Sequence, residues 1–357
     1  MSPTSRLDDA LSKFLSQWEI QWRDVRHRQT LCWMMMGMIQ SQSVHLNGFG
    51  VYVVTRAKVA QSHQRRFRRW LSNQRINVVS AHHVLMKQAL SAWGRERLDL
   101  SLDTTVVWKN SFCIVWVGVV YRGGTVPVAW RVVSPSGSTV RLWTIKRVLR
   151  QAARVVPDGV VVVLLADRGF ADGRLMKYLR ENLGWHGRIR IKRSFQFQLE
   201  GKWHKVSSVQ LSPGQAYFTP VVSIGKTKPY PNVYLAFAHD QPSGEDWVIV
   251  SDEPTTLQTF AQSRLRFQVE ESFLDLKSNG FQIEAARLRD QFALTQLCGV
   301  IALTMLFLVL QGTQVVASGL RPQVDAHWHR GMSYFKLGWN GIRLAITQQW
   351  NIQVFRF

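Results

Sequence analysis

Three carboxylates have the types and surroundings needed for metal-dependent chemistry on phosphate. Asp103 lies within "LDLSLDTTVV", Asp167 follows the apolar run "VVVVLLA", and Glu270 lies within "RFQVEESFLDLK". Carboxylate oxygens are the ligands that hard cations such as Mg²⁺ prefer. Clustered like charges repel each other, and a pair of Mg²⁺ ions removes that penalty. Two such metals activate a water or a 3′-hydroxyl and stabilise the leaving oxygen of a phosphodiester.

Asp167 stands at the end of a strand that we expect to be fully buried. The run 160–166 carries no polar side chain. Such runs are typical of central parallel strands, and ligands bind outside the carboxyl ends of those strands. Two structural alternatives remain open: Asp167 pairs with Arg168, or it caps the helix that follows.

Asp103 belongs to a strand with one apolar and one polar face. The segment alternates strictly, with leucines 98, 100 and 102 on one face and Asp99, Ser101 and Asp103 on the other. That period predicts a half-buried strand, the natural neighbour of strand 160–166. Asp99 is the rival carboxylate, and Asp103 is favoured because Asp99 lies at the start of the strand.

Glu270 is predicted to lie on a helix beside two cationic residues. Arg266, Glu270, Phe273 and Lys277 share one helical face, whereas Glu271 is turned about 100° away. The alternative is an ordinary surface ion pair between Arg266 and Glu270, which contributes little to stability.

The charge balance indicates a polyanionic partner. The 357 residues include 45 Lys and Arg against 23 Asp and Glu, a formal net charge of +22. For a folding chain with 46% hydrophobic residues, nucleic acid is the favoured partner. An anionic membrane surface or a ribosome-like partner is the alternative.

The sequence gives little indication of a membrane-spanning segment or of disulfide bonds. Cys32, Cys113 and Cys298 lie far apart, as expected for buried thiols in a reducing compartment. The apolar run 297–310 is short for a bilayer and reads as a buried helix. No signal peptide is recognisable, so a cytoplasmic protein without membrane contact is expected.

The N-terminal part, residues 1–93, is predicted to be a helical DNA-binding domain. Ser62 is a candidate cap for a helix that places four arginines around Phe67 and Trp70. These arginines are Arg65, Arg66, Arg68 and Arg69. Contact with phosphate is the favoured interpretation, and a solvated basic face is the alternative.

The remaining chain divides by composition into four further parts, which together predict a mixed α/β fold. They are residues 94–192, three strands followed by alternating helices and strands; 193–252, a β-rich insertion; 253–290, the helix with Glu270; and 291–357, a C-terminal helical region.

The motifs "LSLDTT", "LLADRGF" and "RFQVEESFLDLKSNG", in this order, resemble those of bacterial insertion-sequence transposases of the DDE type. The resemblance covers residues 60 to 290. It implies a ribonuclease-H-like core in 94–192, completed by the Glu helix and interrupted by the β insertion. It also implies that Asp103, Asp167 and Glu270 are catalytic and hold two Mg²⁺ ions, for which Mn²⁺ can substitute.

The third motif is the most specific part of the resemblance. Arg266 and Lys277 reproduce the Arg and Lys of the family at its spacing, which implies contacts with backbone phosphates beside the scissile bond. Arg168 adds a further candidate DNA contact. One residue departs from the family pattern: Ser263 replaces a Tyr that helps hold phosphate near a hairpin end.

Trp247 opens "WVIVSDEP", which resembles the close of the insertion domain in hairpin-forming members. The resemblance implies that Trp247 stacks on a base flipped out of the transposon end. The alternative is a tryptophan at the start of an ordinary core strand.

The resemblance therefore predicts a cut-and-paste DNA transposase that cleaves transposon ends and joins them to target DNA, with a hairpin intermediate. Its partners would be duplex DNA, as terminal inverted repeats and target, and a second copy in a homodimer. Its location would be the bacterial cytoplasm, with the nucleoid. The alternatives are a ribonuclease-H-like nuclease or resolvase, and a non-catalytic, domesticated DNA-binding protein.

Overall fold

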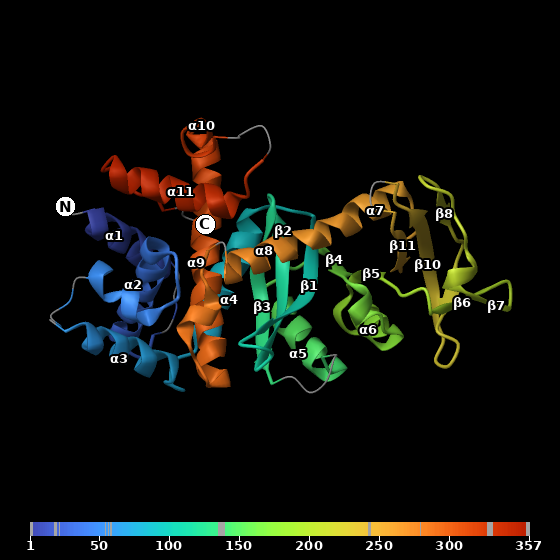
Figure 1. Ribbon diagram of the computed structural model, residues 1–357, viewed down its shortest axis with the longest axis horizontal. Coiled ribbons are helices and arrows are strands. Elements are labelled where there is room, and N and C mark those ends of the chain that lie inside the picture. Colours follow the sequence, from blue (N-terminus) through green and yellow to red (C-terminus); the bar gives the residue numbers. More distant parts are fainter. Residues whose placement is uncertain are drawn as a thin grey trace.

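The computed structural model describes residues 3–17, 20, 22–53, 55, 57, 59–134, 140–241, 244–278, 280–326 and 331–354. Its architecture is mixed α/β, as predicted (Figure 1). Helix α9 stands between the N-terminal helices on one side and the sheet on the other, and the insertion strands form the far end of the molecule (Figure 1).

Within the described residues, eleven strands form one sheet in the order β3-β2-β1-β4-β5-β11-β10-β9-β6-β7, with β8 paired to β10. The β1–β4 and β4–β5 pairs are parallel, and the other pairs are antiparallel. The bounds are β1 Arg97–Val107, β2 Phe112–Tyr121, β3 Gly124–Val133, β4 Val161–Ala166, β5 His186–Arg190, β6 Gln196–Leu199, β7 Lys202–Lys205, β8 Ala216–Phe218, β9 Val222–Ile224, β10 Tyr230–His239 and β11 Asp246–Ser251.

The helices flank this sheet and supply the N- and C-terminal parts. The α-helices are α1 Pro3–Ser16, α2 Val25–Ser41, α3 Ala60–Leu71, α4 Val78–Ala92, α5 Leu142–Ala153, α6 Gly173–Tyr178, α7 Leu257–Arg264, α8 Gln268–Lys277, α9 Gln291–Ala317, α10 Arg321–Val324 and α11 Tyr334–Thr347. Short 3₁₀ turns cover Leu46–Gly48, Gly50–Tyr52, Arg168–Phe170, Val206–Ser208, Leu265–Phe267 and Ile283–Ala286, and a π turn covers Leu179–Leu183.

The two faces of the sheet carry different helices. On the face of Asp103, the Trp130 indole N–H of β3 donates to the Thr295 carbonyl oxygen of α9. The next residue of β3, Arg131, points to the opposite face, where its guanidinium lies over the Trp143 ring of α5. Helix α5 therefore covers the face that α9 leaves free.

Helix α9 is the centre of the core. It is long and apolar enough to cross a membrane, yet 94% of its apolar window is buried inside the protein. The prediction of a buried helix at 297–310 is confirmed. The capping prediction for Ser62 was wrong, because α3 begins at Ala60 with Val59 at its N-cap.

Two glycines allow α9 and α11 to cross at backbone contact. A Cβ on Gly338 would lie 1.8 Å from the Leu308 carbonyl oxygen, and a Cβ on Gly312 would lie 1.9 Å from the Tyr334 carbonyl oxygen. A backbone oxygen has no rotamer by which to move away, so any side chain at either position separates the helices.

We expect Gly338→Ala to lower the free energy of unfolding by about 1–3 kcal/mol, the usual cost of overpacking. This loss would occur even though alanine raises helix propensity by about 1 kcal/mol. Urea denaturation measures it. Gly48→Ala is the control, because a Cβ at Gly48 meets no atom within 4 Å. Unchanged stability in Gly338→Ala would contradict the close crossing.

Candidate active site

The parallel pairing of β1 with β4 places Asp103 and Asp167 at the same level of the sheet. Leu102 is opposite Ala166, and each carboxylate is the next residue along its strand. Asp167 makes no side-chain cap to the turn that follows, and Asp172 caps α6 instead. Within the described residues Asp167 forms no ion pair with Arg168, so neither structural alternative accounts for it.

Arg266 joins Asp103 to Glu270. Its Nη1 lies 3.2 Å from Asp103 Oδ2, and its Nη2 lies 2.9 Å from Glu270 Oε1. The Arg266 side chain is only 6% exposed, against 53% for Glu270. The guanidinium also lies over the Phe267 ring, 4.4 Å from its centroid. The pair is therefore not an ordinary surface ion pair, because its cation is buried against the sheet.

The pKa of Asp103 is affected by both other carboxylates. Burial is the main cause that raises its pKa, and the charges of Glu270 and Asp167 raise it further. The Thr104 N–H, 2.7 Å from Asp103 Oδ1, and the Arg266 guanidinium act in the opposite direction. Glu270 and Asp167 therefore both lie within electrostatic reach of Asp103.

In this conformation two of the three carboxylates, those of Asp103 and Glu270, are paired with Arg266. Among the described residues, no group of three or more His, Cys, Asp or Glu side chains is placed to hold a metal ion. The donor chemistry nevertheless fits a hard divalent cation, because all three side chains offer carboxylate oxygens. Burial is the main cause of the raised pKa of Asp103, and a bound cation would favour the charged form of this carboxylate.

Asp99 belongs to a separate ion network. It lies 3.8 Å from Arg97, and Arg97 and Arg188 both bind Glu253, at 3.3 and 3.0 Å. Asp252, the neighbour of Glu253, accepts from the Gly187 N–H at 2.8 Å. The sequence analysis missed this network. The acidic pair after "WVIVS" was its only sequence signal, and its cationic partners come from other strands.

Two contacts fix the helix that carries Glu270. The Ser272 hydroxyl accepts from the Thr125 N–H of β3 at 3.0 Å and lies 2.8 Å from the Thr125 hydroxyl. One turn further on, Asp275 Oδ1 lies 3.6 Å from Lys336 Nζ of α11. Helix α8 is therefore held by the sheet and by the C-terminal helix together.

Two other predicted DNA contacts, Arg168 and Lys277, differ in their exposure. Arg168 is exposed next to Asp167, and Lys277 is half-buried at the end of α8. Ser263, at the position of the family Tyr, is buried, and its hydroxyl has no hydrogen-bond partner within the described residues.

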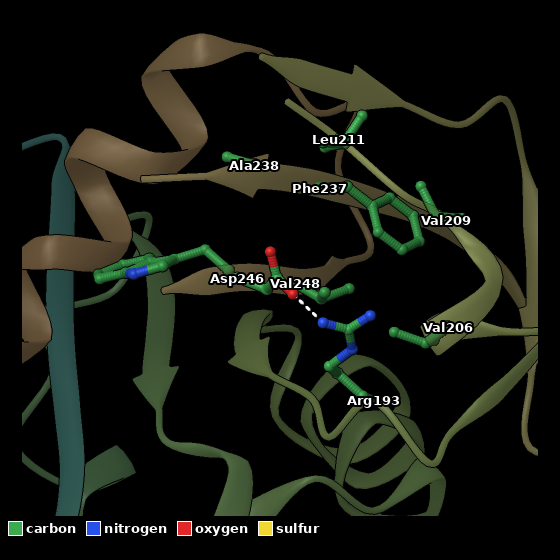
Figure 2. A pocket seen from close by; sticks show the side chains of 9 residues that line it. Arg193, Val206, Val209, Leu211, Phe237, Ala238, Asp246 and Val248 are labelled. Carbon is green, nitrogen blue, oxygen red and sulfur yellow. Dashed lines mark hydrogen bonds and ion pairs between the residues drawn. The ribbon is translucent and has the colours of Figure 1, made fainter. Parts of the chain in front are cut away.

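Trp247 is 6% exposed and lies in β11 within a small apolar cluster. The Arg190 guanidinium lies 4.4 Å from its ring centroid and that of Arg264 lies 5.5 Å away. On one side is a cavity of about 10 Å³, where Arg193 pairs with Asp246 beneath Phe237 (Figure 2). On the other side an open hollow of about 410 Å³ is lined by Trp247, Arg264, Phe260 and other residues.

The four arginines of α3 point outward. Arg65, Arg66, Arg68 and Arg69 are exposed, whereas Phe67 and Trp70 are buried. The Trp70 indole N–H donates to the His27 carbonyl oxygen at 2.9 Å, which ties α3 to α2.

Asp275 predicts a pH dependence of stability. Burial raises its pKa from 3.8 to about 6, with Glu271 adding to the rise and Lys336 opposing it. The native state therefore binds more protons than the unfolded state between these values, and stability falls as pH rises from about 4 to about 6.

We expect Asp275→Asn to remove this fall, so that its free energy of unfolding rises relative to the wild type over the same interval. Urea denaturation across the interval measures the difference. Asp158→Asn, a change at an exposed acid, should keep the wild-type profile. If the free energy of unfolding of Asp275→Asn fell with pH as much as that of the wild type, the pKa of Asp275 would not be raised in the folded protein.

Comparison with known proteins gives a family match. The family model described as a transposase DDE domain matches residues 117–307, which include Asp167 and Glu270. No curated protein matches the chain. A similar solved structure is the cryo-EM structure of a piggyBac transposase synaptic complex with hairpin DNA. It has 9% sequence identity and a TM-score of 0.47, and the match covers 97% of this chain and 77% of that chain.

Proposed function

The chain belongs to the transposase DDE domain family, and from that premise we propose that it cleaves transposon ends and joins them to target DNA. Asp103, Asp167 and Glu270 are the proposed catalytic residues. The observation that carries this assignment is the buried Arg266, which joins Asp103 to Glu270 at the level of Asp167.

The proposed core is ribonuclease-H-like. Three antiparallel strands, β1 to β3, are followed by α5 and then by β4, which pairs in parallel with β1. Strand β5 adds to β4 in parallel, and α8 packs its Ser272 against β3. This arrangement supports a core in which the second Asp ends a central strand.

The three carboxylates would hold two Mg²⁺ ions, with Mn²⁺ as a substitute. When bound, these ions supply a nucleophile and stabilise the leaving oxygen of the phosphodiester. Arg266 positions Asp103 and Glu270 relative to each other and offsets part of their charge. Glu270 is half exposed and held by Arg266, whereas Asp103 is held by the strand, by the Thr104 N–H and by Arg266.

Cationic side chains near the carboxylates would hold the DNA. Lys277 and Arg168 are the proposed contacts to backbone phosphates, with Arg266 nearest the scissile bond. The exposed arginines of α3 are the proposed contacts to the terminal inverted repeats.

Trp247 is the proposed platform for a flipped base in a hairpin step. The hollow of about 410 Å³ beside Trp247 supports this role, since it is large enough for a small ligand. In the conformation described, Arg190 and Arg264 lie over the ring, so stacking requires a guanidinium to move. Ser263 replaces the Tyr that assists this step in similar enzymes.

The proposed assembly is a homodimer on DNA in the bacterial cytoplasm, associated with the nucleoid. A nuclease or resolvase of the same core would cleave without joining, and a domesticated protein would bind DNA without cleaving.

We expect Asp103→Asn, Asp167→Asn and Glu270→Gln each to reduce cleavage of end-containing DNA on the order of 10³-fold or more. DNA binding should persist, because the basic surfaces are unchanged. Mg²⁺-dependent cleavage and joining are measured on DNA that flanks the gene.

Two matched controls make this experiment specific. Asp99→Asn changes an acid on the same face of β1, and Glu271→Gln changes the next residue of α8. Both should retain cleavage if protein stability is preserved. Full activity in any of the three main variants would refute the assignment, and cleavage without joined products would favour the nuclease.

A second prediction concerns α3. Replacing Arg65, Arg66, Arg68 and Arg69 together by Gln should weaken binding to end-containing DNA and lower the slope of log K against log salt by about 3 to 4. Binding is measured by fluorescence anisotropy at several salt concentrations. An unchanged slope would mean that these arginines form only a solvated face.

A further inference from the structure

Helix α5 and its C-cap residue carry an exposed stripe of one tryptophan and three arginines. The proposed active site does not use these residues. Trp143, Arg147, Arg150 and Arg154 follow each other at spacings of 4, 3 and 4 residues, so they lie on one side of the helix. All four are exposed, while Ile145, Val148, Leu149 and Ala152 face the sheet. We call these four residues the α5 stripe.

Trp143 holds two guanidinium groups on its ring. Arg131 of β3 lies 5.8 Å from its centroid, and Arg147 lies 5.6 Å from it. Trp143 is 47% exposed. Here it orders two long side chains before any ligand arrives, which reduces the entropy lost on binding.

The α5 stripe lacks carboxylate partners. Within the described residues, Arg131, Arg147, Arg150 and Arg154 form no ion pair with Asp or Glu. Helix α5 itself contains no acidic residue. Burial and the nearby Arg147 lower the pKa of Arg131, as expected for cations gathered without a counter-charge. A phosphate backbone supplies the missing charge.

Arg131, whose guanidinium lies over Trp143, connects the stripe to the sheet row next to Asp103. In the sheet, Thr104 of β1 pairs with Val115 of β2, and Val115 pairs with Arg131 of β3. Arg131 therefore lies in the same cross-strand row as the residue that follows Asp103, two strands away, or about 10 Å. Its side chain points to the opposite face, where α5 begins and runs away from the carboxyl ends of β1 and β4 (Figure 1).

We propose that the α5 stripe binds the phosphate backbone of target DNA, an inference that rests on the proposed transposase function. Arginines at helical spacing suit phosphate contact, and such contacts carry no sequence information. Joining requires one duplex that is recognised by sequence, the transposon end, and one that is not. The α5 stripe lies on the face of the sheet opposite Asp103 and is separate from the α3 arginines proposed for the transposon ends, so it is available to the second duplex.

The test compares two triple variants with the same charge change. The stripe variant is Arg147→Gln, Arg150→Gln and Arg154→Gln. The control is Arg95→Gln, Arg289→Gln and Arg343→Gln, three exposed arginines outside α5. Circular dichroism and thermal unfolding establish that each variant is folded. Binding is measured on a random-sequence duplex over a range of salt, and cleavage and joining are measured on end-containing DNA with a plasmid target.

We expect the stripe variant to lower the salt slope for the random duplex by about 3, with the control variant near the wild type. Joining to the plasmid should fall while cleavage of ends is retained. Trp143→Ala, which removes no charge, should weaken random-duplex binding about 2- to 5-fold by releasing the two arginines.

Three results would overturn the inference. They are wild-type binding of random duplex by the stripe variant, an equal loss in the control variant, and a loss of end cleavage equal to the loss of joining. The third would assign the stripe to the transposon end. If the wild type neither cleaves nor joins, the proposed function fails, and the binding data still decide whether the stripe holds DNA.

Discussion

The guanidinium of Arg266 imposes the constraint on which the candidate site depends. A cation that is 6% exposed is costly to bury unless its charge is paired. Its partners come from two places, Asp103 on the sheet and Glu270 on α8. Helix and strand must therefore meet at this point, and the acids that could hold metal are brought together by the same contact. A metal bound at the proposed site would compete with Arg266 for the oxygens of Asp103 and Glu270.

The position of Glu270 depends on more than its own ion pair. Ser272 fixes α8 to the edge strand β3, and Asp275 fixes it to Lys336 of α11. Helix α11 in turn crosses α9 at backbone contact through Gly312 and Gly338. The C-terminal helices thus support the proposed catalytic helix from behind, which gives a structural reason for a segment far from the carboxylates.

The sequence predicted the local elements of the site better than their surroundings. The alternation around Asp103 and the apolar run before Asp167 were sufficient to place two acids on neighbouring strands, because both signals are local. The burial of Arg266 was not predictable, since helical spacing gives the partner at Glu270 but not the strand beneath it. The network of Arg97, Arg188 and Glu253 was missed because it requires β11 to pair with β5 across an insertion of about sixty residues. The bounds of helix α11 within the predicted C-terminal helical region were hard to predict. Glycine lowers helix propensity, and the glycines of α11 serve packing instead.

Two amphipathic helices, α3 and α5, carry clusters of positive charge on their exposed faces. In α3 the arginines alternate with Phe67 and Trp70, and in α5 they alternate with Val148 and Leu149, so the apolar residues anchor each helix in the core. Clustered arginines repel one another and contribute nothing to a core, so fold stability alone gives no reason to keep them. Because each helix is held by its buried face, the exposed face is free to carry charge that only a polyanion neutralises. The α3 arginines lie among the N-terminal helices, and the α5 stripe lies on a helix that packs against the sheet. That separation agrees with the proposed transposase function, in which two duplexes would be held at once.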